Sequence, residues 1–494
     1  MTRFPTALLA TLLLVHPSSA QHHDQQIPRF EPDSTSFPVS VPSAFRALTG
    51  YLVVYEDRAD PDGPTIRLPV AVLRARSGAS AEGPVLYLAG GPGSSALNAA
   101  AYPGAYPWTS ERDFVVIGQR GTDFAQPALT CREFGAARAG GQFSDLAAAS
   151  RASQRAAAAR CKAEFTVKGI DPADYTTAAS VEDIEDLRRV LGIDQWTLYA
   201  VSYGTRLALA LVREYPESVR AAVLDSILPP QARYDDESAD NLQQAFDLIF
   251  RDCFAAPACD SAFPELRSRF YAALEHAEGQ PIPVTIRGQN GPRGISLRGA
   301  DLATLVSTGS RSAIAEAPFL FDAIARRDTS VIRARVAGSI GPSSFAWGMR
   351  LSVWCSEFLP FSERNREASP GDALFGLESA VVVPSVCDAW GVPERPQREV
   401  MAVASDVPTL LIAGEYDAAT PPKWALQASE TLSNSRVVVV RGAGHTPTQD
   451  WGGDGCAMRV AAKFVSIGDH SAGDAEAEAC LRDRSAPEFI LDRE

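Results

Sequence analysis

One serine stands where it could act as a nucleophile. Trp196 to Val201 is an apolar run that predicts a buried strand. Ser202-Tyr-Gly breaks the run, and an apolar pattern with helical spacing resumes at Leu207. A strand, a sharp turn and a helix with serine at the apex form a nucleophile elbow. The usual pattern has glycine two residues before the serine. Here Ala200 takes that place, and its small side chain still permits the turn.

A serine nucleophile needs a base, and the base needs an orienting acid. Of the six histidines, His445 alone follows a predicted buried strand and lies in a glycine-lined loop. The acid should follow the preceding strand, where Glu415 and Asp417 both qualify by position. We favour Asp417, because Thr420-Pro421 would fix its loop, and we interpret Glu415 as a structural or solvated carboxylate.

The order serine, aspartate, histidine along the chain is that of the α/β-hydrolases and differs from the trypsin-like and subtilisin-like orders. Such an enzyme also needs N–H donors for an oxyanion, each typically worth about 10²–10³ in rate. Tyr203, the residue after the nucleophile, supplies one candidate. Gly91 supplies the other, in a glycine-rich loop after the apolar segment 85–89 that lacks the lysine of a nucleotide-binding loop.

The segments around these residues alternate between strands and helices, which predicts a parallel sheet covered on both faces. Segments 51–55 and 66–76 predict an antiparallel hairpin at the sheet edge, after an extended lead-in at 21–43. Ser180 and Asp183 form a capping-box pattern that predicts the start of a helix ending at Gly192. We interpret Arg120 as a structural hydrogen-bond donor.

This alternation stops after the strand at 219–227 and returns at residue 407, with helical and proline- or glycine-rich segments between. We therefore predict an α/β-hydrolase fold with a mostly parallel eight-stranded sheet and an inserted, mostly helical cap. The predicted parts are a signal peptide (1–20), a first core segment (21–230), the cap (231–398) and a C-terminal core segment (399–494) that carries the acid and the base.

The composition limits the function classes. A formal charge of −14 argues against nucleic acids and anionic membranes as partners, and 46% hydrophobic residues allow a large core. Arg3, the apolar stretch 7–15 and the small residues 18–20 form a signal-peptide pattern, with a stretch too short for the roughly 20 residues that span a bilayer. We expect an exported, periplasmic or secreted monomer without membrane insertion after signal cleavage, and without a cofactor.

The eight cysteines, an even number, fit an oxidising compartment, and their spacing matches no zinc site, so we expect no metal. Eight cysteines allow 105 pairings. We predict that nearest neighbours in sequence are bonded, which gives the pairs Cys131–Cys161, Cys253–Cys259, Cys355–Cys387 and Cys456–Cys480.

Several motifs together resemble the α/β-hydrolase exopeptidases, the group of proline iminopeptidases and secreted tripeptidyl aminopeptidases. They are Gly90-Gly-Pro-Gly-Ser, Arg120-Gly-Thr, Ser202-Tyr-Gly-Thr, Gly414-Glu-Tyr-Asp-Ala-Ala-Thr-Pro and Gly444-His-Thr. The tripeptidyl aminopeptidase branch is the more similar, in being exported, in carrying cysteines around the cap and in having a C-terminal segment that supplies the acid and the base. Ala89 departs from the histidine that opens the loop in proline iminopeptidases. The resemblance implies cleavage at a free peptide N-terminus.

An enzyme of this kind needs an anion that pairs with the substrate ammonium group. The segment Ser352-Val-Trp-Cys-Ser-Glu-Phe resembles the one that carries an acidic residue in relatives, which points to Glu357. A structural carboxylate beside a disulfide is the other interpretation of Glu357. Asp225 is a weaker candidate that we interpret as structural.

Other functions of a related chain would place different demands on these residues. A serine esterase or lipase would use the same triad on a carboxylic ester, because the fold supports both chemistries. A binding protein built on an inactive hydrolase is disfavoured by the presence of all three triad residues. An epoxide hydrolase or dehalogenase would have aspartate in place of Ser202.

Overall fold

A computed structural model of the chain describes residues 27–78, 83–139, 144–288, 291–339, 345–363, 382–469 and 475–492. The predicted signal peptide, residues 1–20, lies outside the described residues. None of the helices in the described segments combines the length and the apolar character needed to cross a bilayer.

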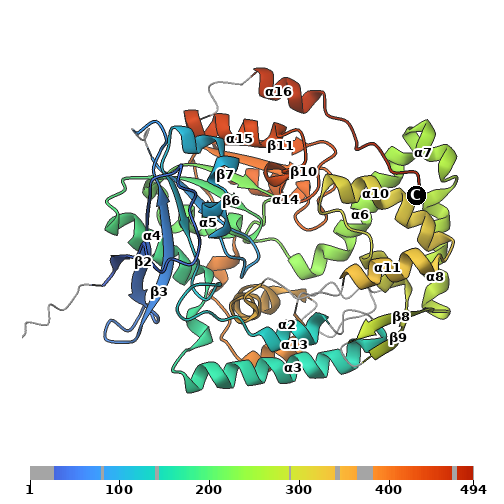
Figure 1. Cartoon of the computed structure of the whole chain (residues 1–494), viewed down its shortest axis with the longest axis horizontal. Coiled ribbons are helices and arrows are strands. Elements are labelled where there is room, and N and C mark those ends of the chain that lie inside the picture. The colour runs from blue at the N-terminus through green and yellow to red at the C-terminus, as the bar shows by residue number, and fades with distance from the viewer. Residues whose placement is uncertain are drawn as a thin grey trace, which may run out of the picture.

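A nine-stranded sheet in the order β1-β2-β3-β5-β4-β6-β7-β10-β11 forms the centre of the fold (Figure 1). Strands β5, β4, β6, β7, β10 and β11 run parallel to one another. Strands β1, β2 and β3 pair antiparallel at one edge of the sheet. The strands are β1 (Arg29–Pro32), β2 (Ala47–Tyr55), β3 (Thr65–Leu73), β4 (Val85–Leu88), β5 (Phe114–Ile117), β6 (Trp196–Val201), β7 (Val219–Asp225), β10 (Thr409–Gly414) and β11 (Ser435–Val440).

The predicted number of eight strands was therefore wrong by one. The additional strand, β1, lies in the segment that we expected to be an extended lead-in, and Phe30 pairs with Leu52 of β2. Four residues that end in proline carry too little pattern to predict a strand. Pairing with β2 and the ion pair between Glu31 and Arg67 of β3 (2.7 Å) stabilise this segment as a strand.

Alternate residues of the strands enter two different cores, as the period of two in a strand requires. On one face, Leu86, Leu198 and Leu224 pack with helices α4 (Thr177–Val190), α5 (Tyr203–Glu214) and α14 (Pro422–Ser429). On the other face, residues such as Tyr87 and Tyr199 pack with α1 (Asn98–Ala101) and α15 (Cys456–Ile467). Both faces are covered, so β4, β5, β6 and β10 are buried throughout.

The chain between β7 and β10 forms a separate core, visible beside the sheet in Figure 1. Its helices are α6 (Tyr234–Ala255), α7 (Pro257–Ala262), α8 (Leu266–Gly279), α9 (Gly299–Thr304), α10 (Arg311–Ala325) and α11 (Thr329–Ser339). The proline- and glycine-rich segment between these helices is not helical. It forms the hairpin β8 (Ile282–Gly288) and β9 (Gly291–Leu297), because Val284, Ile295 and Leu297 reach the core formed by the helices.

A second cluster joins segments on both sides of Ser202 in the sequence. Helices α2 (Arg132–Ala139) and α3 (Ser144–Val167) pack with α12 (Trp347–Val353) and α13 (Pro384–Trp390). Trp347, Trp354 and Trp390 fill this cluster. The helices of this second cluster therefore come both from the predicted cap and from the first core segment.

The four disulfides in the structure are the four pairs expected from the sequence. They join Cys131 to Cys161, Cys253 to Cys259, Cys355 to Cys387 and Cys456 to Cys480. The first three tie helices of the two clusters above the sheet, and the last ties α15 to α16 (Ala475–Arg482).

The C-terminal residues cross from the sheet to the separate core (Figure 1). The N–H of Ile490 donates to the main-chain oxygen of Ala315 in α10 (2.9 Å), and Phe489 packs against the core of that region. Arg311, at the start of α10, donates to the main-chain oxygens of Gly442 (3.0 Å) and Ser485 (3.2 Å).

The N-cap of helix α4 lies four residues earlier than predicted. Thr176 is its N-cap and accepts the N–H of Ala179 (3.1 Å), while Ser180 lies inside the first turns and donates its hydroxyl to Thr176 (3.0 Å). The capping-box prediction was therefore wrong, because Asp183 has another partner. Its carboxylate receives two hydrogen bonds of 2.8 Å from Arg120, which is fully buried, and pairs with Arg58.

We predict that Asp183→Asn lowers the free energy of unfolding by about 3–5 kcal/mol, because Arg120 would keep its charge in the interior without a counter-charge. Urea unfolding of the two proteins measures this. The exposed Asp194→Asn is the control and should change the value by no more than about 0.5 kcal/mol. A loss at Asp183 no larger than that of the control would contradict the prediction.

Candidate active site

Ser202 occupies a strained turn between β6 and α5. Its backbone has φ 55° and ψ −128°, a conformation that costs a non-glycine residue about 1–3 kcal/mol. Gly204 permits the turn, because a Cβ there would overlap the carbonyl oxygen of Leu88. The N–H of Ser202 donates to the main-chain oxygen of Asp225 (2.9 Å), which ties the turn to β7. The strand, turn and helix expected around the serine are present.

Asp417 and His445 meet directly after β10 and β11. Nδ1 of His445 lies 2.8 Å from Oδ2 of Asp417. The N–H groups of Ala419 (2.9 Å) and Thr420 (3.0 Å) donate to Oδ1 of Asp417, and the Thr420 hydroxyl donates to Oδ2 (2.7 Å). The Asp417 side chain is 1% exposed and that of His445 is 26% exposed. The carboxylate is thus fixed in the interior while the imidazole reaches the surface.

This contact sets the pKa of both groups. Burial would raise the pKa of Asp417, but the charge and hydrogen bond of His445, together with Thr420, hold it below its ordinary value. Burial would lower the pKa of His445, yet the charge and hydrogen bond of Asp417 raise it above the ordinary value. Asp417 is therefore ionised at neutral pH and stabilises a proton on the imidazole.

Glu415, the alternative acid, has other partners. Arg251 donates to one of its carboxylate oxygens (3.1 Å), and the N–H of Gly442 donates to the other (3.0 Å). These contacts hold the loop after β11 in place. The structure thus brings Asp417, and not Glu415, to the histidine.

The three predicted triad residues share one edge of the sheet, because they follow neighbouring parallel strands. The register pairs Val201 with Asp225, Asp225 with Ile412, and Gly414 with Val440. Ser226, directly after β7, joins the loops. Its hydroxyl donates to Oδ2 of Asp417 (2.9 Å) and accepts the N–H of Thr446 (2.8 Å). The sequence pattern alone did not single out Ser226, although its position after a buried strand at this edge was a usable signal.

The glycine-rich loop lies against the serine. A Cβ on Gly90 would lie 2.8 Å from Cβ and 3.3 Å from Oγ of Ser202, so the loop backbone approaches the hydroxyl closely. Tyr203 is the first residue of α5, where N–H groups lack a partner within the helix. The N–H groups of Gly91 and Tyr203 remain the predicted oxyanion donors, on segments that flank the serine.

Arg350 of α12 supports the glycine-rich loop. Its Nη1 donates to the main-chain oxygen of Gly91 (2.7 Å). The guanidinium carbon lies over the rings of Phe345, Trp347 and Trp354, at 4.6, 5.5 and 4.9 Å from their centroids. No local pattern in the sequence marks Arg350, because its role depends on the packing of distant segments.

Glu357 lies in a buried cluster next to the elbow helix. One carboxylate oxygen accepts the N–H of Thr177 (2.7 Å), and the other accepts its hydroxyl (2.6 Å) and lies 3.5 Å from Nε of Arg206. Burial raises the pKa of Glu357, and Arg206 and Thr177 oppose that shift. The side chain of Glu357 is 2% exposed.

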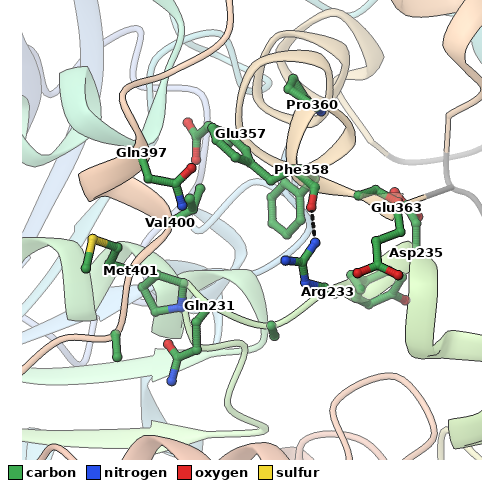
Figure 2. Close-up of a pocket in the computed structure, with 16 residues that line it drawn as sticks. Gln231, Arg233, Asp235, Glu357, Phe358, Pro360, Glu363, Gln397, Val400 and Met401 are labelled. Atoms are coloured by element: carbon green, nitrogen blue, oxygen red, sulfur yellow. Dashed lines mark hydrogen bonds between the residues drawn. The ribbon is translucent and has the colours of Figure 1, made fainter. Parts of the chain in front are cut away.

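Glu357 also lines a cavity of about 1020 Å³. Figure 2 shows Glu357 beside Gln397 on one wall, with Arg233 and Asp235 across the cavity. Among the described residues that line it, none belongs to the predicted triad. The structure thus places Glu357 close to α5 but leaves its predicted ammonium-binding role untested.

The described residues contain two groups of metal-ligand type, Cys131 with Glu133 and Cys161, and Asp454 with Cys456 and Cys480. In each group the two sulfur atoms are bonded to each other, so neither provides a free thiolate.

Two family models match parts of this chain, and several named proteins are similar to most of it. A model described as alpha/beta hydrolase fold matches residues 83–277, and one described as TAP-like protein matches residues 375–477. The serine protease Hip1 of Mycobacterium tuberculosis is 26% identical over 471 residues, covering 86% of this chain and 85% of that protein. A tripeptidyl aminopeptidase of Streptomyces lividans is 24% identical and covers 80% and 77%.

A shorter match and a solved structure carry related names. A proline iminopeptidase of Neisseria gonorrhoeae is 30% identical over 108 residues, 21% of this chain and 34% of that protein. The crystal structure of a proline iminopeptidase of Mycobacterium smegmatis aligns at 16% identity with a TM-score of 0.39, covering 82% of this chain and 96% of that chain. From the family matches and the observed sheet, the chain is an enzyme of the α/β-hydrolase fold with a TAP-like C-terminal part, related to serine proteases and aminopeptidases.

Proposed function

We propose that the chain is an exported serine aminopeptidase that hydrolyses peptides from a free N-terminus. The observation that carries the proposal is the 2.8 Å contact between His445 Nδ1 and Asp417 Oδ2 at the sheet edge where Ser202 stands. With Nδ1 held by the acid, Nε2 of the imidazole serves the serine hydroxyl. The full-length relatives named serine protease and tripeptidyl aminopeptidase support a peptide substrate.

In the proposed reaction, Oγ of Ser202 attacks the scissile carbonyl carbon while His445 accepts the hydroxyl proton. The N–H groups of Gly91 and Tyr203 stabilise the oxyanion that forms. His445 then gives its proton to the leaving amine, and the peptide bond breaks to leave an acyl-enzyme. A water molecule repeats the attack with His445 as base, which releases the N-terminal fragment and restores the serine hydroxyl.

Export is part of the proposal. The four disulfides support it, because such bonds form and persist in oxidising compartments. The signal-peptide pattern in residues 1–20 remains a sequence prediction, and so do the destination, periplasm or medium, and the monomeric state.

Glu357 remains the predicted partner of the substrate ammonium group. Arg206 already provides a cation 3.5 Å from its carboxylate, so a bound ammonium group would be the second positive charge at this site. The raised pKa of Glu357 and its contacts with Thr177 equally fit a structural role beneath α5. Only a measurement with matched substrates separates the two roles.

We predict that Ser202→Ala lowers kcat by about 10⁶. Asp417→Asn should lower kcat by about 10⁴, because the amide no longer holds His445 in the required tautomer. Steady-state kinetics on a peptide anilide measures both. Glu415→Gln is the matched control, since Glu415 bonds Arg251 and Gly442 rather than the histidine. The acid assignment is wrong if Glu415→Gln loses activity and Asp417→Asn keeps it.

The pH dependence follows from the raised pKa of His445. Only the neutral imidazole accepts the serine proton, so kcat/KM should fall as the pH drops through this pKa, with a midpoint above about 6.5. In Asp417→Asn the imidazolium loses its counter-charge, so the midpoint of the residual activity should move to lower pH. A midpoint that stays in place in this variant would contradict the assignment.

Three substrates test the substrate class: a free-amine tripeptide anilide, its N-acetylated form and a short-chain nitrophenyl ester, each with Ser202→Ala as the blank. We expect cleavage of the free-amine peptide only. Turnover of the ester alone would instead identify an esterase.

Glu357→Gln separates the two roles of Glu357. A rise in KM confined to the free-amine peptide would assign ammonium binding, because a neutral amide cannot pair with the charge. Equal losses on every substrate, with a lower thermal stability, would assign a structural role.

A further inference from the structure

Asp225, the last residue of β7, contacts both loops that carry the proposed nucleophile and base. Its main-chain oxygen accepts the N–H of Ser202 (2.9 Å). Oδ2 of its carboxyl group accepts the N–H of Thr448 (2.9 Å) and the Thr448 hydroxyl. Thr448 follows His445 by three residues in the same loop. One fully buried residue thus joins the elbow turn to the histidine loop.

The same loop is held by two tyrosines of the sheet. Because the Thr448 hydroxyl donates its proton to Asp225, it accepts the hydroxyl of Tyr199 on β6 (2.7 Å). The Tyr199 ring stacks on Tyr87 of β4 with 5.5 Å between centroids, and the Tyr87 hydroxyl accepts Nε2 of Gln449 (3.1 Å). These contacts anchor the turn Pro447–Gln449 to three adjacent strands.

The hydrogen bonds do not by themselves require a carboxyl group, since an asparagine carbonyl would accept both donors. In the described part of the chain, Oδ1 of Asp225 is buried without a hydrogen-bond partner. Burial of a charge is unfavourable unless another charge compensates it. The charged or titratable groups that face Asp225 are Tyr87, Tyr199, Asp417 and His445, and among them only His445 can become a cation.

The electrostatics of the pair agree with this geometry. Burial raises the pKa of Asp225 to about 7, Thr448 and His445 act against this rise, and Asp417 adds to it. In turn, the charge of Asp225 contributes to raising the pKa of His445. The charge of each group therefore favours the ionised form of the other.

We propose that Asp225 is a positioning residue for the base, a second carboxylate that holds the His445 loop through Thr448 and stabilises the imidazolium formed during the reaction. This inference rests on the proposed function of Ser202, His445 and Asp417. Asp417 orients the imidazole by direct contact, whereas Asp225 acts through Thr448 and through its charge. Neither the sequence pattern nor the relatives' names assign this role to Asp225.

The test measures the pKa of His445 directly, by NMR titration of the imidazole signal assigned by its absence in His445→Gln. Asp225→Asn keeps an acceptor for Thr448 but removes the charge. The pKa of His445 should therefore fall by about half a unit or more, since a nearby negative charge favours the imidazolium. The acid limb of kcat/KM should move to lower pH by the same amount. Asp194→Asn, an exposed carboxylate before the amino end of β6, is the control and should leave the pKa unchanged.

Thr448→Val tests the connection between Asp225 and the His445 loop from the side of the loop. It also provides the test if Asp225→Asn does not fold. This variant keeps the carboxyl group and removes the hydroxyl, so the loop is held less well. We expect kcat to fall about tenfold to hundredfold with little change in KM, because misplacement of the base affects the chemical step more than binding.

The outcomes separate this inference from the proposed function. An unchanged His445 pKa in Asp225→Asn, or a wild-type kcat in Thr448→Val, would overturn the role of Asp225 while the aminopeptidase activity stands. A shifted pKa in a protein that cleaves none of the three substrates would support the charge coupling and reject the proposed function. A merely structural role would lower the stability of both variants without moving the pKa.

Discussion

Backbone strain at the carboxyl edge of the sheet is the constraint on which the site depends. Ser202, Ser226 and Thr446 all have positive φ, at 55°, 59° and 55°, in loops that follow β6, β7 and β11. Each such residue costs about 1–3 kcal/mol and persists only where its surroundings fix it. Here the loops fix one another, through Ser202 N–H to the oxygen of Asp225 and Thr446 N–H to the hydroxyl of Ser226. The buried strands below supply the rigidity, so the three loops are held as one unit.

The sequence predicted the parts of the site that depend on local pattern. Ser202, Asp417 and His445 each follow an apolar run, and parallel strands bring their carboxyl ends to one edge whatever the remaining packing is. Contacts between distant segments left no such pattern. The pairing of Glu357 with Arg206, the support of Gly91 by Arg350 and the contribution of Asp183 to the Arg120 site all depend on how helices pack. The hairpin β8–β9 was missed for the same reason, since its proline and glycine residues mask a core face.

The segment between β7 and β10 takes part in the site. The N–H of Ala346 donates to the oxygen of Gly93 (2.9 Å), next to the bond from Arg350 to Gly91. On the other side, a Cβ on Gly444 would overlap the main-chain oxygen of Thr308. The two loops beside the serine, one glycine-rich and one carrying the histidine, therefore both pack against backbone from this segment. Changes in its packing would reach the geometry of the reaction as well as the shape of the substrate site.

The C-terminal tail changes how that segment can move. An insertion that is joined to a domain only by its two chain connections can rotate as a rigid body about the line between them. The bond from Ile490 to Ala315 and the contacts of Arg311 with Ser485 add an attachment at α10, within the inserted core (Figure 1). The insertion can therefore move away from the sheet as a rigid body only if these contacts with the tail break, as well as those of Ala346 and Arg350 with the glycine-rich loop. Movement of the insertion is thereby coupled to the loop that carries His445, because Arg311 also donates to the main-chain oxygen of Gly442.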